Sequence, residues 1–206
     1  MLYSIIRLTF LVIAIIVIVI ITRKTGRISA LSCGLAVLAC LTVADMRFPI
    51  ENITGYLKTP QQAFSYCHSG EIKVTEEGEN SALIIYEDDE SLEVNAVTKG
   101  KRGWKVNPFF SYSTVYSEKL SGENLNCNLE IYRAKDTDDY YVLIDNWFTS
   151  ENADISDNRQ SEFRCTENPA GNGVTAKSYT FYAYVKDIGD DYEIKINDET
   201  VKINIG

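Results

Sequence analysis

The chain has 206 residues, of which 45% are hydrophobic, and carries 29 acidic against 20 basic side chains. Only basic charges (Arg7, Arg23, Lys24 and Arg27) precede residue 45, so the remainder holds 16 positive against 29 negative charges, a net −13. A surface of this sign repels nucleic acid and anionic lipid, so we expect neither as a partner of the part outside the membrane.

The first predicted element is a transmembrane helix over residues 2–21. Its stretch "LTFLVIAIIVIVII" (8–21) consists of Leu, Ile, Val or Phe at twelve of fourteen positions. Twenty helical residues extend about 30 Å, the thickness of the hydrocarbon core. An arginine at the centre of a spanning helix costs about 3 kcal/mol, and one near a helix end, such as Arg7, costs less. The apolar residues of this segment outweigh that cost.

The second predicted element is a helix over residues 28–44, "ISALSCGLAVLACLTVA", rich in small residues. Ser32, Ala36, Cys40 and Ala44 recur every four residues and predict a narrow face that a neighbouring backbone can approach closely. We expect this face to pack on the first helix, giving a transmembrane helical hairpin with a turn at residues 22–27. A homodimer through the same face is the alternative.

The charges of the turn predict the orientation of this hairpin. Arg23, Lys24 and Arg27 lie within the short turn, and cytoplasmic loops collect such residues. The prediction is a two-pass protein of the cell membrane with its N-terminus and its C-terminal domain extracytoplasmic. The alternative is a lipoprotein signal ending in "VLAC" (37–40), with Cys40 lipidated, which also leaves the remainder outside.

Residues 45–58 predict a juxtamembrane linker, and residues 59–206 a mainly β, antiparallel domain with one short helix. Thr59, Pro60 and Gln62 have the spacing of a helix N-terminus with a capping box. A rise in polarity at 121–126 suggests two subdomains, 59–120 and 127–206.

Alternating or continuous apolar runs bounded by turn residues predict the strands of this domain. The continuous run "SALIIYE" (81–87) is typical of a central strand, and the polar stretch 149–160 of a long loop. Asn197-Asp198 predicts a two-residue hairpin turn. The other predicted strands are 92–98, 104–106, 127–134, 140–147, 178–187, 191–197 and 199–205.

The stretch from "TPQQAF" (59–64) through "SALIIY" (81–86) to "GWKV" (103–106) resembles small uncharacterised proteins on the outer surface of Gram-positive bacteria. The resemblance covers residues 48–106. It implies a location on the outer surface and brings no activity, so no functional residue is transferred.

Three cysteines lie outside the predicted helices: Cys67, Cys127 and Cys165. An exported domain can oxidise them, and only one intramolecular pair can form. We predict a disulfide between Cys127 and Cys165, which flank a loop of about forty residues worth around 3–4 kcal/mol in the chain-entropy account. Three free thiols are the alternative.

Aromatic residues supply the one candidate binding surface. In "SYTFYAYVK" (178–186), Tyr179, Phe181 and Val185 share one face of a strand and resemble core. Tyr182 and Tyr184 share the other face and predict an exposed platform for a sugar ring or a peptide. Cross-strand aromatic pairing inside the domain is the alternative.

No set of residues predicts catalysis, a metal site or a cofactor. Cys67 and His68 are adjacent, and neighbouring side chains at a helix end point different ways. The acidic clusters 87–90, 136–139 and 187–193 lack the spacing of a calcium loop. We therefore expect a non-enzymatic extracytoplasmic domain that binds or senses an envelope ligand. The alternatives are an accessory subunit docking on a membrane protein through its helices, and an envelope enzyme of unknown type.

Overall fold

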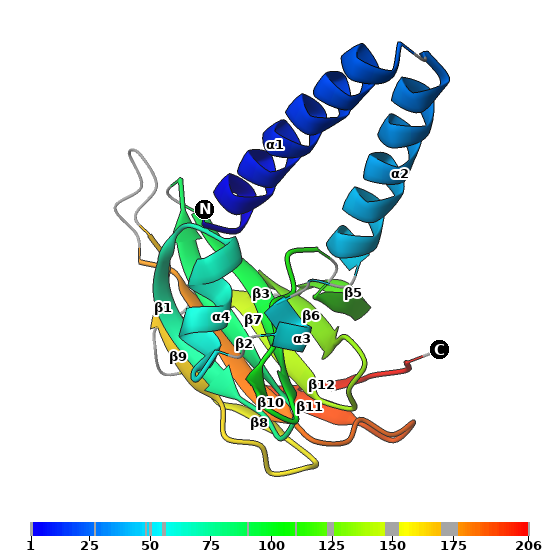
Figure 1. The fold of residues 1–206 in the computed structure, drawn as a ribbon. Coiled ribbons are helices and arrows are strands. Elements are labelled where there is room, and N and C mark those ends of the chain that lie inside the picture. The colour runs from blue at the N-terminus through cyan, green and yellow to red at the C-terminus, as the bar shows by residue number, and fades with distance from the viewer. Residues whose placement is uncertain are drawn as a thin grey trace.

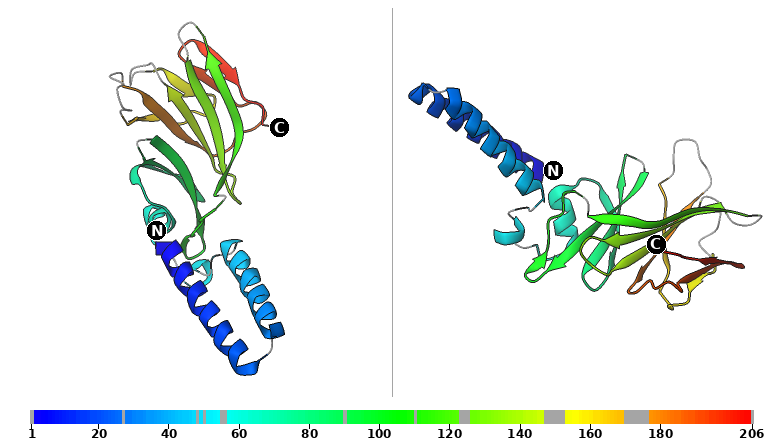
Figure 2. Two further views of the ribbon diagram at one scale, coloured as in Figure 1. Left: turned by 90° about the horizontal axis from the view of Figure 1, so that it is seen from above. Right: turned by 90° about the vertical axis from the view of Figure 1, so that its right-hand side faces the viewer.

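The computed structural model describes residues 2–26, 28–47, 49, 51–54, 57–89, 91–109, 111–122, 126–146, 153–169 and 177–205. Two long helices project from a domain built mostly of antiparallel strands (Figures 1 and 2). The helices are α1 (Leu2–Thr25), α2 (Ile28–Arg47), α3 (Glu51–Thr54) and α4 (Pro60–Cys67).

The helix α1 is the one long apolar helix in the described part of the chain. Its segment Tyr3–Thr25 has the length and composition needed to cross a membrane. The apolar part of α2, Leu31–Asp45, is shorter. It falls below the roughly 20 residues that usually span a bilayer.

The helix α2 returns beside α1 (Figure 1). At the centre of the contact, Gly34 faces Ile18: a Cβ on Gly34 would lie 3.0 Å from the Cγ2 of Ile18. The half-buried positions recur at helical spacing on both helices and form one seam: Leu11, Ala14, Ile18 and Thr22 on α1, and Leu31, Gly34, Leu38 and Thr42 on α2.

The predicted packing face of α2 is not part of this seam. Ser32, Ala36, Cys40 and Ala44 are all exposed. The prediction that they pack on α1 was therefore wrong. The reason is that the half-buried face of α2 contains Leu31, Gly34 and Leu38, and the side chain of Ile18 on α1 packs against Gly34.

The strands in the described ranges form three sheets. Sheet I has the order β1-β2-β3-β4, sheet II β5-β6-β7-β10-β9, and sheet III β12-β11-β8, with every pairing antiparallel. The strands are β1 (Glu71–Glu77), β2 (Ser81–Asp88), β3 (Ser91–Gly100), β4 (Gly103–Trp104), β5 (Tyr112–Ser121), β6 (Asn126–Ala134), β7 (Tyr140–Asn146), β8 (Ile155–Asp157), β9 (Arg164–Glu167), β10 (Tyr179–Val185), β11 (Glu193–Ile196) and β12 (Glu199–Lys202).

The core consists of three apolar layers between four structural layers. The helix α4 packs on sheet I around Phe64, sheet I packs on sheet II around Leu83 and Tyr141, and sheet II packs on sheet III around Ile144 and Ile194. Strands β2 and β10 are therefore buried on both faces. This confirms the continuous apolar run of 81–87 as a central strand, since such runs are typical of strands covered on both sides.

Local signals predicted several elements correctly. Thr59 caps α4, its side chain accepting a hydrogen bond from the backbone of Gln62, with Pro60 in the first turn. Asn197 adopts a positive φ of 53° in the two-residue turn between β11 and β12. The predicted loop 149–160, by contrast, contains β8, which pairs with β11.

The predicted boundary between two subdomains does not follow the sheets. β5 ends at Ser121 and β6 begins at Asn126, and the two strands pair from Tyr112 opposite Ala134 to Ser121 opposite Asn126. The polarity of this stretch marks a hairpin connection inside sheet II.

Candidate functional site: the junction of the helices with the β-domain

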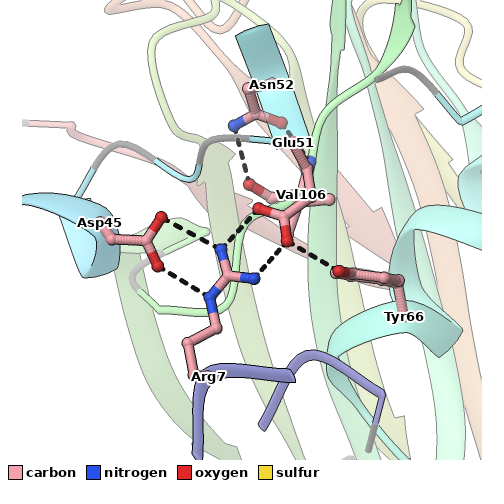
Figure 3. A network of polar contacts seen from close by, with 6 residues as sticks. All are labelled: Arg7, Asp45, Glu51, Asn52, Tyr66 and Val106. Atoms are coloured by element: carbon pink, nitrogen blue, oxygen red, sulfur yellow. Dashed lines mark hydrogen bonds and ion pairs between the residues drawn. The ribbon is translucent and has the colours of Figure 1, made fainter. Parts of the chain in front are cut away.

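A polar network joins the two long helices to the β-domain (Figure 3). We call its members, Arg7, Asp45, Glu51 and Tyr66, the junction. Arg7 donates two hydrogen bonds to Asp45, at 2.7 and 3.1 Å, and two to Glu51, one of them at 2.6 Å. The hydroxyl of Tyr66 donates to Glu51 at 2.7 Å. One guanidinium thus connects α1, α2, α3 and, through Tyr66, α4.

Local structure holds Arg7 in place. Tyr3 lies one turn earlier on α1, and its ring lies 4.1 Å from the Arg7 guanidinium carbon. Tyr3 also meets the ring of Tyr66 edge to face, with ring centres 6.2 Å apart. A cation over an aromatic face is attracted by the ring quadrupole, so Tyr3 and the two carboxylates together fix one conformer of Arg7.

The junction is screened from water in part. The side chains of Arg7 and Glu51 are each 21% exposed, and that of Asp45 is 27% exposed. Burial alone pushes the pKa of Glu51 upward, but the hydrogen bonds from Arg7 and Tyr66 outweigh it, and the pKa lies below its ordinary value. Burial, and then the bond to Glu51, raises the pKa of Tyr66 to about 12. Glu51 is therefore an ionised acceptor and Tyr66 a neutral donor.

A second set of contacts ties the segment after α2 to sheet I. The Asn52 amide donates to the carbonyl of Val106 at 3.0 Å and accepts from its N–H at 2.7 Å. The backbone of Trp104 donates to Leu57 at 2.8 Å. The described residues of the predicted linker 45–58 are thus hydrogen-bonded to the domain at several points.

The predicted topology residues lie at the opposite end of the helix pair. Arg23 and Lys24 are exposed in the last turn of α1, far from the β-domain (Figure 1). Arg27 lies outside the described residues. Charged residues therefore lie at both ends of the apolar part of the helix pair: those of the junction at one end and those of the turn at the other.

The predicted aromatic platform is absent from the surface. Tyr182 is 7% exposed and packs between sheets I and II. The hydroxyl of Tyr184 donates to Asp139 at 3.0 Å, and its ring packs against the same core. The exposed platform was a wrong prediction because sheet I covers this face of β10, whereas Phe181 and Val185 lie in the core between sheets II and III, as predicted.

The predicted disulfide is also wrong. Cys127 is buried on β6 and Cys165 is exposed on β9, both as free thiols. Strands β7 and β10 lie between them, so three strand spacings, about 14 Å, separate the two backbones. A disulfide needs Cα atoms within about 7 Å.

Cys67 and His68 have separate surroundings. Burial, reinforced by the charge of Glu51, raises the pKa of the Cys67 thiol to about 12, which disfavours a reactive thiolate at neutral pH. The Nε2 of His68 lies 3.2 Å from the Asn95 amide nitrogen, and its ring stacks on Phe64. These contacts orient the imidazole toward sheet I.

Sequence reasoning missed the junction. It treated Arg7 only as a cost of membrane insertion. The available signal was an arginine inside an apolar run, followed by the first two acidic residues of the chain, Asp45 and Glu51. Within the described ranges, no three His, Cys, Asp or Glu side chains gather in a way that would hold a metal ion.

No protein-family model matches the chain, and no match was found among curated proteins or solved structures. The junction and the layered β-domain are therefore interpreted from their own geometry.

Proposed function

We propose that the chain is a two-pass membrane protein that holds an extracytoplasmic β-rich binding or sensing domain in a fixed orientation above the bilayer. The observation that carries this proposal is the bonding of Arg7 to both Asp45 and Glu51. Through these bonds the ends of both long helices and the start of the domain behave as one unit.

The geometry of the helix pair supports two membrane crossings. α2 has 20 residues, of which the apolar part, Leu31–Asp45, is about 22 Å long, so its crossing requires local thinning of the bilayer. It runs back along α1, so its apolar residues lie at the same depth as those of the first span. The basic turn at one end and the junction at the other place charge at both interfaces, where long side chains extend into the headgroup region.

The junction also supports retention of α1 in the mature protein. An apolar N-terminal helix is shared by membrane anchors and cleaved signal sequences. Here Tyr3 and Arg7 complete a network with Glu51 and Tyr66, and cleavage of α1 would remove the cation that Asp45 and Glu51 share. The continuous helix through Cys40 likewise favours a second span over a lipidated N-terminus.

A rigid connection between the helices and the β-domain can transmit a conformational change from the domain to the helices. A flexible linker would only keep the domain near the membrane. Ligand-induced shifts in sheet I would reach α3 through the bonds between Asn52 and Val106, and reach α1 through Glu51 and Arg7. The resemblance to outer-surface proteins and the net charge of −13 on the domain are compatible with an extracytoplasmic location.

The test is a distance measurement between spin labels on the full chain in nanodiscs. One label occupies the exposed Cys165 and the other a Thr25→Cys variant, with Cys33, Cys40 and Cys67 replaced by serine. We expect a narrow distance distribution that broadens in Arg7→Gln. A broad distribution in the parent chain would contradict a rigid connection.

The accessory-subunit function is supported by a different observation, the exposure of Ser32, Ala36, Cys40 and Ala44 on α2. Small residues on an open helix face allow close approach of another transmembrane helix. This function predicts a stoichiometric membrane partner, or a second copy of the chain, in detergent extracts. Ala36→Leu together with Cys40→Leu should release that partner, and retention of the partner would contradict docking through this face.

A further inference from the structure

A polar cleft of about 410 Å³ opens at one end of the interface between sheets I and II. Its walls come from five separate segments: the turn between β1 and β2, the end of β3, the residue after β4, the hairpin between β6 and β7, and the end of β10. Four lysines line it, namely Lys99, Lys105, Lys135 and Lys186. Four carboxylates line it as well, those of Glu79, Asp136, Asp138 and Asp139, so the charge offered to a ligand depends on which lysines are free of these groups.

Two carboxylates at the cleft are already neutralised by ion pairs. Glu79 accepts from Lys186 at 2.6 Å. Asp138 accepts from Arg133 at 2.7 Å. Lys186 is therefore occupied as well, and these pairs add no net charge to the cleft.

A third carboxylate, Asp139, is saturated by hydrogen bonds within the protein. Asp139 is 2% exposed and accepts from the backbone of Asn80 and the hydroxyl of Ser81, both at 2.7 Å, and from Tyr184 at 3.0 Å. These bonds join the turn between β1 and β2 to the hairpin between β6 and β7. They make the floor of the cleft rigid.

Three ammonium groups remain without a carboxylate. Lys99, Lys105 and Lys135 form no ion pair with any residue that the structure describes. The ammonium of Lys99 lies 5.8 Å from the ring centre of Trp104, which packs between α4 and sheet I, so this ammonium is on the α4 side of the sheet. The stem of Lys105 crosses Gly100, where a Cβ would lie 3.0 Å from its Cε. Asp136 is the one lining carboxylate with no described partner.

We infer that this cleft binds a phosphate group carried on a hydroxylated carbon skeleton, as in glycerol phosphate. Ammonium groups are point charges that suit a compact tetrahedral anion. Lys105 and Lys135 supply a charge of +2 to the phosphate, and Asp136 accepts a hydrogen bond from a hydroxyl of the same molecule. The volume of the cleft lies within the range of small-ligand sites.

The inference deepens the proposed function by assigning a ligand class to the binding domain. The same chemistry occurs in free glycerol phosphates and in the head group of phosphatidylglycerol. An extracytoplasmic domain held beside a bilayer can meet both sources.

The test uses calorimetry on the full chain in phosphatidylcholine nanodiscs, with sn-glycerol 3-phosphate as the probe and glycerol as the uncharged comparison. We expect saturable binding of the phosphate only. Lys105→Gln with Lys135→Gln should weaken it at least tenfold, while the control Lys119→Gln, an exposed lysine on β5, leaves it unchanged. Asp136→Ala should reduce the preference for glycerol 3-phosphate over inorganic phosphate, because it removes the hydroxyl acceptor and, for both ligands alike, a repelling charge.

Nanodiscs containing phosphatidylglycerol distinguish the two sources. Competition by the lipid, seen as a several-fold weaker apparent affinity for the soluble probe, identifies a lipid head group; an unchanged affinity identifies a free ligand. Absence of saturable phosphate binding, or equal affinity in the parent and the double lysine variant, would overturn the inference. Nanodiscs expose both membrane sides, so this result is independent of the topology on which the proposed function depends.

Discussion

Arg7 and Glu51, separated by 44 positions in the chain, form a two-point ion pair between the start of α1 and α3, the first helix after α2. Asp45 accepts from the Nε–H and from an Nη2–H of the same guanidinium. An arginine near a membrane is expensive without partners, and here its charge is matched by two carboxylates within a partly buried site.

Replacing Arg7 by Gln should destabilise the junction. Asp45 and Glu51 would then lie close together as partly buried negative charges without a cation. We expect a loss of about 2–4 kcal/mol, below the largest values for fully buried pairs because these side chains retain some solvent. Thermal unfolding in detergent measures it. Arg23→Gln, at the exposed end of the same helix, is the control, and an equal loss in both variants would contradict the role of Arg7.

Replacing Tyr66 by Phe should have a smaller effect. It removes the 2.7 Å hydrogen bond to Glu51 and keeps the ring contact with Tyr3. We expect a loss of about 1 kcal/mol and an upward shift of the Glu51 pKa, which NMR titration of the carboxyl can follow. Tyr116→Phe, whose hydroxyl bonds the exposed Glu118, serves as the control. An unchanged Glu51 titration would show that Tyr66 does not hold the carboxylate.

Acidification should destabilise the domain through His68. Burial lowers the pKa of His68 below its ordinary 6.5, despite the opposing bond with the backbone of Asn107. The unfolded chain therefore binds the proton first, so stability is full above pH 6.5 and falls as the pH drops toward the folded-state pKa. Denaturant titrations between pH 7 and pH 5 measure this slope. His68→Gln should flatten it, and an identical slope in both chains would contradict the assignment.

Gly34 lies on the face of α2 that packs against α1, whereas Ala36 lies on the exposed face. Gly34→Leu would force a side chain into Ile18 and should cost about 1–3 kcal/mol of packing. Ala36→Leu adds the same side chain to an exposed position and should leave the helix pair intact. Thermal unfolding in detergent compares the two. A larger loss for Ala36→Leu would restore the small-residue face as the packing surface.

Local signals predicted part of the β-domain, including α4, β2 and the turn between β11 and β12, but not β8, which lies inside a predicted loop. Thr59 and Gln62 identified the start of α4, and the continuous apolar run 81–87 identified a strand covered on both sides, because each of these signals acts between near neighbours. The burial of Phe181 and Val185 was predicted from the alternation of side chains between the two faces of a strand.

Long-range pairing could not be predicted in the same way. The order β6-β7-β10-β9 puts two strands between Cys127 and Cys165, which no local spacing reveals. Alternation assigned Tyr182 and Tyr184 to one face but did not show that another sheet covers it. Arg7 depends on Asp45 and Glu51, which reach it only when α2 returns beside α1.

The central claim is that both helices cross the membrane and the β-domain lies outside. Labelling of cysteines in intact cells with a membrane-impermeant maleimide tests it most directly, using the exposed native Cys165 and a Thr25→Cys variant in the turn. We predict that Cys165 reacts at once, with Cys165→Ser as the control, and that the thiol introduced by Thr25→Cys reacts only after permeabilisation. Labelling of the turn in intact cells, or protection of Cys165 until permeabilisation, would contradict the account.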